Sequence, residues 1–397
     1  MNKTILLIVS LIVTAGCSPK EKKPQPLKVD GLASPAQSPS AEPYLFTNES
    51  GITYLSWIEK KEKESKLKYA TLTESQWSKP VTIDSGFTWF VNWADYPMIA
   101  TNGKSFMAHY LEKSGSSTYA YDIKLTSSTD GRNWNKSAIL HDDGKLAEHG
   151  FVSIAPYGEN FFVSWLDGRN TAMEGMDHHE GHHGEMSVRA AVLDKEGKKL
   201  NEWELDKRVC DCCQTSAAIT DNGPVVVYRD RTADEIRDMS IVRLIDGQWS
   251  EPKSIHDDNW KIAGCPVNGP RVAARGNHLA IAWFSMPEGQ AQVNLLRSAD
   301  GGKTFDMPVR IDEGSAIGRV DVVILEDGAT MVSWMEGPQI KVVKVNIDGT
   351  RDNSISIASS SDSRSSGFPQ MTISAGRLIF AWTDDKEKNI KTASISL

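Results

Sequence analysis

The chain has 397 residues, of which 40% are hydrophobic and 24% are charged, a composition typical of a folded protein with one large domain or two to three small ones. Its 44 basic and 52 acidic residues give a formal net charge of −8. This balance argues against nucleic acid as the main partner, because nucleic-acid binding requires a basic surface. Thirty glycines indicate many tight turns, Trp (12) outnumbers both Phe and Tyr, and the number of Cys, five, is odd.

The N-terminus predicts export. An apolar run over residues 5–13 is too short to cross about 30 Å of hydrocarbon as a helix, so it is typical of a signal peptide. The small residues 14–16 before Cys17 resemble a bacterial lipobox. The resemblance implies a signal peptide over 1–16, lipidation of Cys17 and a location in the cell envelope, in the outer membrane if the host is Gram-negative. An ordinary secretory signal with an incidental Cys is the alternative.

Residues 17–43 contain six prolines among Lys, Ser and Ala. A stretch of this composition buries little apolar surface and stays extended. We therefore expect residues 17–43 to form a tether and the folded domain to span 44–397.

The rest of the chain repeats one pattern about seven times. Each copy has a polar turn and then an apolar run that ends in an aromatic residue, usually followed closely by an acidic one. The aromatic positions, which recur every 48 to 63 residues, are Trp57, Tyr110, Trp165, Tyr228, Trp283, Trp334 and Trp382. Runs rich in β-branched and aromatic residues between turns are typical of strands. A strand-only repeat of about 50 residues suits the four-stranded blade of a β-propeller.

A turn motif supports the propeller. The segment Ser298-Ala-Asp300-Gly-Gly-Lys-Thr304-Phe305 resembles the Asp-box, or BNR repeat, of the sialidase superfamily, and residues 128–134 form a copy one residue shorter. In such a turn the Ser and Asp side chains hold backbone N–H groups, and Gly supplies a positive φ. The resemblance implies an all-β propeller. Seven repeats favour seven blades, whereas the six-bladed sialidases leave six as the alternative.

The repeats also predict how the propeller is built. Most tryptophans fall on repeat positions, so we expect them to pack within or between blades. The last repeat shows only three strands, and a strand near 27–32 or 44–46 could complete it by pairing with the C-terminal segment.

In a propeller, the starts of the inner strands and the ends of the second strands converge on one axial face, where ligands bind. Candidate anion contacts there are Arg169, Arg229, Arg231 and Arg319, with His149 and Asn268 as further ligand-binding residues. Candidate acid–base groups are Asp230, Asp321 and Glu336. Each of these residues could instead form a salt bridge between blades.

The resemblance to sialidases implies an arginine clamp for a carboxylate and a Tyr nucleophile, and glycoside hydrolysis requires paired carboxyl groups. The Arg-Ile-Pro motif of that family is missing here, and Tyr228 occupies a packing position. The first hypothesis is therefore a glycan-directed protein, binding or hydrolysing, that acts between blades three and six.

A second group of residues indicates metal chemistry. Cys210, Cys212 and Cys213 open the inner strand of the fourth blade, and Cys265 opens the next one. An insertion in the third blade adds His and Met residues, and its candidate ligands are Met176, His178, His179, His182, His183 and Met186. Thiolate, thioether and imidazole ligands favour copper or zinc over magnesium or calcium.

The alternatives to a metal site are disulfides among the four cysteines and a solvated insertion without metal. A copper- or zinc-binding surface protein is the second hypothesis. A protein-interaction scaffold without a small ligand is the third.

Overall fold

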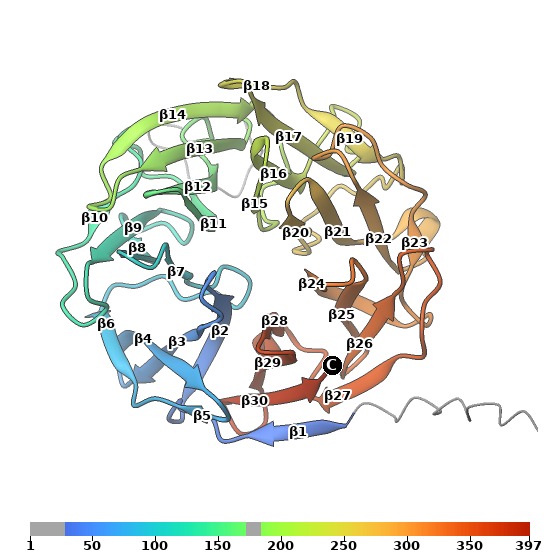
Figure 1. The fold of residues 1–397 in the computed structure, drawn as a ribbon. Coiled ribbons are helices and arrows are strands. Elements are labelled where there is room, and N and C mark those ends of the chain that lie inside the picture. Colours follow the sequence, from blue (N-terminus) through green and yellow to red (C-terminus); the bar gives the residue numbers. More distant parts are fainter. Residues whose placement is uncertain (1–27, 172–183) are drawn as a thin grey trace, which may run out of the picture.

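The computed structural model describes residues 28–171 and 184–397, and these form a seven-bladed β-propeller (Figure 1). Seven antiparallel sheets, each of four or five strands, are arranged around one axis. The only helices in the described part of the chain are two short 3-10 turns, Pro287–Gly289 and Arg364–Ser366. The structure thus confirms the all-β fold and the four-stranded blade, and it settles the number of blades at seven.

In each blade, four strands follow one another from the axis outwards. Blade one has β2 (Ser40–Thr47), β3 (Thr53–Lys61), β4 (Glu64–Thr73) and β5 (Gln76–Trp77), with β6 (Val81–Gly86) also paired to β4. Blade two has β7 (Ile99–Thr101), β8 (Phe106–Lys113), β9 (Tyr121–Ser128) and β10 (Ala138–Ile139). Blade three has β11 (His149–Tyr157), β12 (Asn160–Asp167), β13 (Ser187–Leu193) and β14 (Lys199–Asp206).

Blade four has β15 (Ser216–Thr220), β16 (Gly223–Arg229), β17 (Met239–Ile245) and β18 (Gln248–Trp249), with β19 (Lys253–His256) also paired to β17. Blade five has β20 (Arg271–Arg275), β21 (His278–Ser285), β22 (Gln292–Ser298) and β23 (Val309–Arg310). Blade six has β24 (Ala316–Ile324), β25 (Thr330–Glu336), β26 (Gln339–Val345) and β27 (Ile355–Ser359). Blade seven has β28 (Gln370–Ser374), β29 (Arg377–Asp384), β30 (Asn389–Ser396) and β1 (Val29–Leu32).

The two ends of the propeller chain close the ring in blade seven. Strand β1 (Val29–Leu32) pairs antiparallel with β30 (Asn389–Ser396), so that Val29 lies opposite Ile395 (Figure 1). This confirms the strand expected near residues 27–32. The strand at 44–46 instead belongs to β2, the inner strand of blade one. Pairing of β1 covers an edge of β30 that would otherwise be open.

The boundary expected at residue 44 is therefore too late. Both β1 and the first residues of β2 fall within 17–43, the segment expected to be an extended tether. Its proline content misled the prediction, because the prolines lie outside β1 and a four-residue strand carries a weak sequence signal. Cys17 and the signal peptide lie outside the described residues.

The repeated tryptophans are packing residues. Trp57, Trp165, Trp283 and Trp334 are each at most 1% exposed. Tyr228 is also fully buried, and its hydroxyl donates to Asp206 Oδ2 at 2.7 Å. The prediction that the repeat aromatics hold the blades together is confirmed at these positions.

The turn at Ser298 has the expected hydrogen bonds. The Ser298 hydroxyl accepts from the Gly302 amide at 2.9 Å, and Asp300 accepts from both the amide and the hydroxyl of Thr304. Gly301 and Gly302 have φ of 70° and 84°, the left-handed region that glycine adopts without strain.

One face of the ring collects the starts of the inner strands and the ends of the second strands, and we call it the axial face. His149, at the start of β11, lies opposite Asp167 at the end of β12, and Ala316 lies opposite Glu336 in the same way. The start of β20 contributes Arg271, which reaches across to Asp321, Tyr96 and Gln370. A polar network therefore links the inner strands of blades five, six and seven to the segment before blade two.

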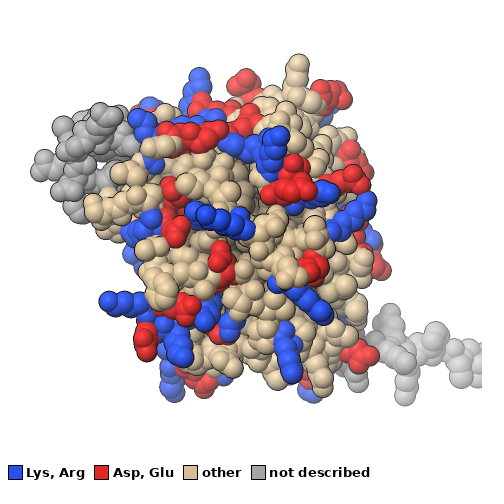
Figure 2. Space-filling model, turned by 90° about the vertical axis from the view of Figure 1, so that its left-hand side faces the viewer, with Lys and Arg blue, Asp and Glu red and all other residues tan. Residues whose placement is uncertain are grey.

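Basic and acidic side chains are intermixed on the outer surface at the side drawn on the left in Figure 1, as Figure 2 shows. No helix in the described part of the chain is both long and apolar enough to cross a membrane.

Candidate functional site

Two of the four predicted anion contacts are buried inside the protein. Arg229 is 1% exposed, and its guanidinium donates to the backbone carbonyls of Arg237, Asn268 and Phe284. It also stacks on the ring of Trp260. Four of its five N–H donors are used in these bonds, so Arg229 joins blades four and five and does not face an open ligand site.

Arg319 is 6% exposed and is held in the same manner. It donates to the Ser366 hydroxyl and to the carbonyls of Ser363 and Gly367. Burial lowers the pKa of Arg319 to about 10, because only the charge of Asp362 supports its own. Arg319 therefore orders the loop that precedes blade seven.

The other two arginines form ion pairs. Arg169 binds both carboxylate oxygens of Asp167, each at 2.8 Å. Arg231 binds Glu235 at 2.8 Å and lies 3.5 Å from Asp211. The structure does not bring the four arginines together as one clamp, because each is engaged at a different blade junction.

The predicted acid–base groups are also used inside the fold. Glu336 accepts hydrogen bonds from the Trp334 indole and from the amides of Glu313 and Ser315. Asp321 binds Arg271 and accepts from the Met371 amide at 2.7 Å. Both carboxylates are therefore engaged by partners within the fold.

Asp230, the third predicted acid–base group, is also engaged within the fold. It accepts from the Ser240 hydroxyl and from the Arg231 amide. Burial raises the pKa of Asp230 to about 6, and the negative charge of Asp206 adds to the effect. Asp230 therefore keeps its proton to a higher pH than an ordinary aspartate does.

Asn268 lines an open pocket of about 800 Å³ at the junction of blades five and six on the axial face. Trp260, Lys261, Phe284 and Glu288 also line it. The side-chain oxygen of Asn268 accepts from the Arg319 amide at 2.8 Å, so it also fixes the backbone at the start of β24.

The thiols form a compact cluster beside this pocket. The sulfur of Cys210 lies 3.6 Å from that of Cys213 and 4.0 Å from that of Cys212. Cys210 and Cys213 are each 1% exposed, Cys212 is half-buried, and Cys265 is exposed and adjoins the cluster through Cys212. All four are free thiols at distances longer than the 2.05 Å of an S–S bond, so the predicted disulfides are not present.

The surroundings of Cys210 make its thiol more acidic than an ordinary one. Hydrogen bonds from the thiols of Cys212 and Cys213, together with the charges of Arg229 and Arg237, hold the pKa of Cys210 well below its ordinary value against the effect of burial. The Arg237 guanidinium lies 3.2 Å from the Cys210 sulfur. Burial raises the pKa of Cys213 to about 12. The three cysteines thus share a largely buried environment with the guanidinium groups of Arg229 and Arg237.

Of the His and Met residues predicted as further ligands, Met186 lies in the described part of the chain. It is 2% exposed and packs in the hydrophobic core. Met176, His178, His179, His182 and His183 lie outside the described residues.

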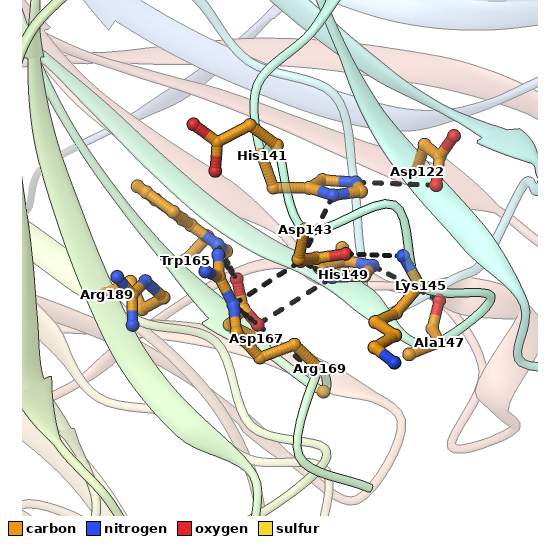
Figure 3. Close-up of polar contacts among 12 residues, drawn as sticks. Asp122, His141, Asp143, Lys145, Ala147, His149, Trp165, Asp167, Arg169 and Arg189 are labelled. Atoms are coloured by element: carbon orange, nitrogen blue, oxygen red, sulfur yellow. Dashed lines mark hydrogen bonds and ion pairs between the residues drawn. The ribbon is translucent and has the colours of Figure 1, made fainter. Parts of the chain in front are cut away.

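His149 lies in a cluster of histidine and aspartate residues where blades two and three meet (Figure 3). Its ring stacks on that of His141 with centroids 3.5 Å apart and planes 4° apart. The side chain of Asp143 lies between the two rings' polar edges, 2.9 Å from His149 Nε2 and 3.4 Å from His141 Nδ1. Asp122 lies 3.4 Å from His141 Nε2.

Four important residues escaped the sequence analysis: Asp122, His141, Asp143 and Arg237. His141 and Asp143 lie in the loop between blades two and three, where no repeat position marks them. Asp122 lies in β9 and Arg237 just before β17, the third strands of blades two and four, whereas the expectations covered only inner and second strands. The paired His141 and Asp143 offered a local signal, because imidazole and carboxylate at i and i+2 can act together.

No family model matches the chain, and no curated protein matches it in sequence. Solved structures resemble its fold. The polysaccharide lyase Uly1 superposes with a TM-score of 0.52 at 10% identity and covers 95% of this chain and 94% of its own. An α-L-arabinanase from Penicillium chrysogenum has a TM-score of 0.51 at 9% identity and covers 93% and 97%. The NanB sialidase from Streptococcus pneumoniae (K499G mutant) has a TM-score of 0.48 at 11% identity and covers 87% and 83%.

The arabinanase and the polysaccharide lyase show that the chain shares their fold. Identities near 10% show the architecture and leave the chemistry to the residues of this chain. The Asp-box resemblance has no support from a sequence family.

Proposed function

We propose that the protein binds a soft metal ion, copper(I), through Cys210, Cys212 and Cys213 at the axial face. The observation that carries this proposal is the spacing of the three sulfurs, 3.6 and 4.0 Å from Cys210. Three thiolates at about 2.3 Å from one ion lie roughly 3.8–4.0 Å apart. The cluster therefore has the dimensions of a metal–thiolate site before any metal enters.

The surroundings of the cluster favour a monovalent ion. Three thiolates around one copper(I) carry two excess negative charges, and the guanidinium groups of Arg229 and Arg237 are the cations next to them. Two of the three sulfurs are almost fully buried, which excludes the water and oxygen ligands that hard ions prefer. Soft sulfur ligands select copper(I).

The second part of this proposal is the location of the protein in the cell. We propose that the chain is exported and anchored by a lipid at Cys17, so that the axial face meets metal ions outside the cytoplasm. A buried thiolate beside two arginines also resists oxidation to a disulfide as long as an ion occupies it, because the metal holds the sulfurs apart.

Copper(I) titration of the purified protein under anaerobic conditions, in competition with a chromophoric chelator, tests the proposal. We expect one equivalent to bind with sulfur-only coordination by X-ray absorption, and the C210S/C212S double variant to lose that equivalent. The matched control is Cys265→Ser, which keeps the three sulfurs of the cluster. Sulfur-free coordination, or equal binding by the double variant and the native protein, would refute the thiol site.

A second candidate function is glycan binding in the pocket of about 800 Å³ at the junction of blades five and six. Its volume suits a short oligosaccharide, and Lys261, Asn268 and Glu288 supply polar contacts along an apolar wall. Since Glu288 is the one carboxylate among the described lining residues, the pocket supports binding and not hydrolysis. A glycan array probed with native protein and with the K261A and E288A variants tests this candidate. If the native protein retains no glycan, or if both variants retain as much glycan as the native protein, the candidate is rejected.

A further inference from the structure

A pocket of about 370 Å³ lies on the axial face where blades one and seven meet (Figure 1). Strand β2 begins beside it, and β3 and β29 end beside it. Blade four, which carries the thiols, lies on the far side of the ring, so this pocket is separate from the proposed copper site. Its volume falls within the range of pockets that bind small molecules, roughly 300–1,000 Å³.

Two buried polar atoms line this pocket without a partner. They are Oε2 of Glu42 and the hydroxyl of Thr383, a residue that is 3% exposed. Neither atom makes a hydrogen bond to any described residue. Because buried polar groups nearly always have partners, two such atoms at one pocket indicate that a ligand supplies their hydrogen bonds.

The backbone of β2 is shaped around Glu42. The register of β2 with β3 shifts between Ala41 and Tyr44, which marks a β-bulge. A bulge redirects the side chains that it carries and is common beside functional sites. The Glu42 carboxyl group thus lines the pocket, while the residues on either side of the bulge keep their pairing with β3.

The charged groups of the pocket leave one acid and one base available to a ligand. Lys388 pairs with Asp385 at 2.6 Å, so these two charges are matched. Lys60 forms no ion pair in the described part of the chain, and it is exposed at the rim. Lys60 is close enough for its charge to oppose the effect of burial on the pKa of Glu42. The pocket therefore offers a buried carboxyl group and an exposed ammonium group near each other.

Much of the remaining lining is apolar. Ile58, Val91 and Trp93 contribute side chains to it. The ring of Trp93 is fixed by Phe368, with centroids 5.7 Å apart, and by Arg319, which lies 5.1 Å from the ring centroid. This wall is therefore formed before a ligand enters, as is usual for small-molecule sites.

We propose that this pocket binds a free α-amino acid with an apolar side chain. The ammonium group of the ligand donates to Glu42 Oε2 and to the Thr383 hydroxyl, its carboxylate pairs with Lys60, and its side chain packs against Val91 and Trp93. A carboxylate that is out of contact with water is stabilised by a cation, which an ammonium group supplies and a neutral sugar does not. The proposal is independent of the copper site and of glycan binding between blades five and six.

Isothermal titration calorimetry of the full-length protein with L-leucine, L-methionine and L-phenylalanine tests the proposal. We expect at least one of them to bind with one equivalent. The N-acetyl derivative lacks the ammonium group and the amide lacks the carboxylate, so each should bind at least about tenfold more weakly. Glu42→Gln and Thr383→Val, which keep the size of the side chain, should weaken binding by a similar factor. In Lys60→Met, the amino acid and its amide should bind equally.

Glu62→Gln is the matched control and should bind as the native protein does. Glu62 has nearly the same backbone φ as Glu42 (56° against 55°), but it is exposed and does not line the pocket. Thr383→Val keeps the test valid if Glu42→Gln fails to fold. The proposal is overturned if no amino acid binds at about 10 mM, as a pocket filled by water alone would predict. Equal affinity in the native protein and in the folded pocket variants overturns it too. So does binding of a neutral monosaccharide, such as glucose or galactose, that is lost in Glu42→Gln while amino acids do not bind.

Discussion

The indole of Trp165 donates its Nε1 hydrogen to Asp167 Oδ2 at 2.8 Å, two residues further along β12. Residues at i and i+2 of a strand lie on the same face, so the acidic residue is placed to satisfy the indole. The same contact joins Trp57 to Glu59 at 2.9 Å and Trp334 to Glu336 at 2.7 Å. The acidic residue that follows the aromatic in the repeat therefore serves the blade, and its place on the axial face does not make it a ligand.

This relationship predicts a large loss of stability in Glu336→Ala. The substitution leaves the buried Trp334 indole without its acceptor, whereas the exposed amides of Glu313 and Ser315 can turn to water. We expect the free energy of unfolding to fall by about 1–3 kcal/mol, measured by urea denaturation with circular dichroism. Glu336→Gln, which keeps an acceptor, should cost about half as much. A change below about 0.5 kcal/mol for the Ala variant would show that solvent satisfies these donors.

The same contact explains what the sequence could and could not reveal. The spacing of Trp57, Trp165 and Trp334 predicted the blades, because packing repeats with the architecture. The roles of Asp167 and Glu336 could not be predicted, because a carboxylate at the mouth of a propeller has the same sequence signature whether it meets an indole or a ligand. Only the structure shows which one it meets.

The two clusters of possible metal ligands also differ in whether the sequence could predict them. Cys210, Cys212 and Cys213 are adjacent in sequence, so their convergence was predictable. Asp122, His141 and His149 come from three separate elements, and their convergence depends on how blade two docks on blade three. Contacts between blades carry no local signal, which is why the repeat predicted the number of blades and missed this cluster.

The burial of the Glu42 carboxyl group predicts that the stability of the protein depends on pH. Its Oε2 is buried without a partner, and burial raises the pKa of Glu42 to about 7 although Lys60 opposes this. Unfolded glutamate loses its proton near 4.5, so between these pH values the folded state binds more protons, and stability falls as the pH rises. Gln resembles the protonated acid and does not titrate. The advantage of Glu42→Gln in unfolding free energy should therefore grow by about 2–3 kcal/mol from pH 4 to pH 8.

Urea denaturation across this pH range measures the effect. Glu62→Gln is the matched control, because Glu62 has nearly the same backbone φ (56° against 55°) but is exposed. Parallel pH profiles for native protein and Glu42→Gln would contradict the assignment of a neutral, buried carboxyl group.

Closure of blade seven predicts that the segment before residue 33 stabilises the propeller. Val29 and Leu32 of β1 pack on the cores of neighbouring strands, and the Thr392 hydroxyl donates to the Leu32 carbonyl. A protein that begins at Ala33 should lose about 3 kcal/mol of stability and aggregate more readily through the open edge of β30. A protein that begins at Lys28 is the control. Equal melting temperatures would mean that β1 adds nothing and that the fold begins at β2.

The proposed lipidation of Cys17 predicts that the protein is found in the membrane fraction of cells. We expect the native chain to incorporate a clickable fatty acid and to sediment with membranes, and Cys17→Ser to do neither. Ser18→Ala, which leaves the thiol in place, should behave as the native chain does. A native chain that takes up no fatty-acid label would exclude this anchor and favour an ordinary secretory signal.

The contact between Arg237 and Cys210 predicts that Arg237 strengthens the binding of an ion by the thiol cluster. Its Nη1 lies 3.2 Å from the Cys210 sulfur, and Glu235 fixes the other end of the fork at 2.8 Å. Arg237→Met keeps the length of the side chain and removes the charge, so a copper–thiolate complex with excess negative charge loses its nearest counterion. Copper(I) affinity should fall at least tenfold, a change of about 1.4 kcal/mol that is typical of a hydrogen bond to a charged group.

Arg231→Met is the control for this last prediction. Arg231 also pairs with Glu235, but its other partners are Asp211 and Glu185 and not a sulfur. Both variants change the net charge equally, so a general electrostatic effect would weaken copper(I) binding in both. A loss confined to Arg237→Met shows that contact with the Cys210 thiolate stabilises the bound ion, whereas equal losses would assign the effect to the overall field of the axial face.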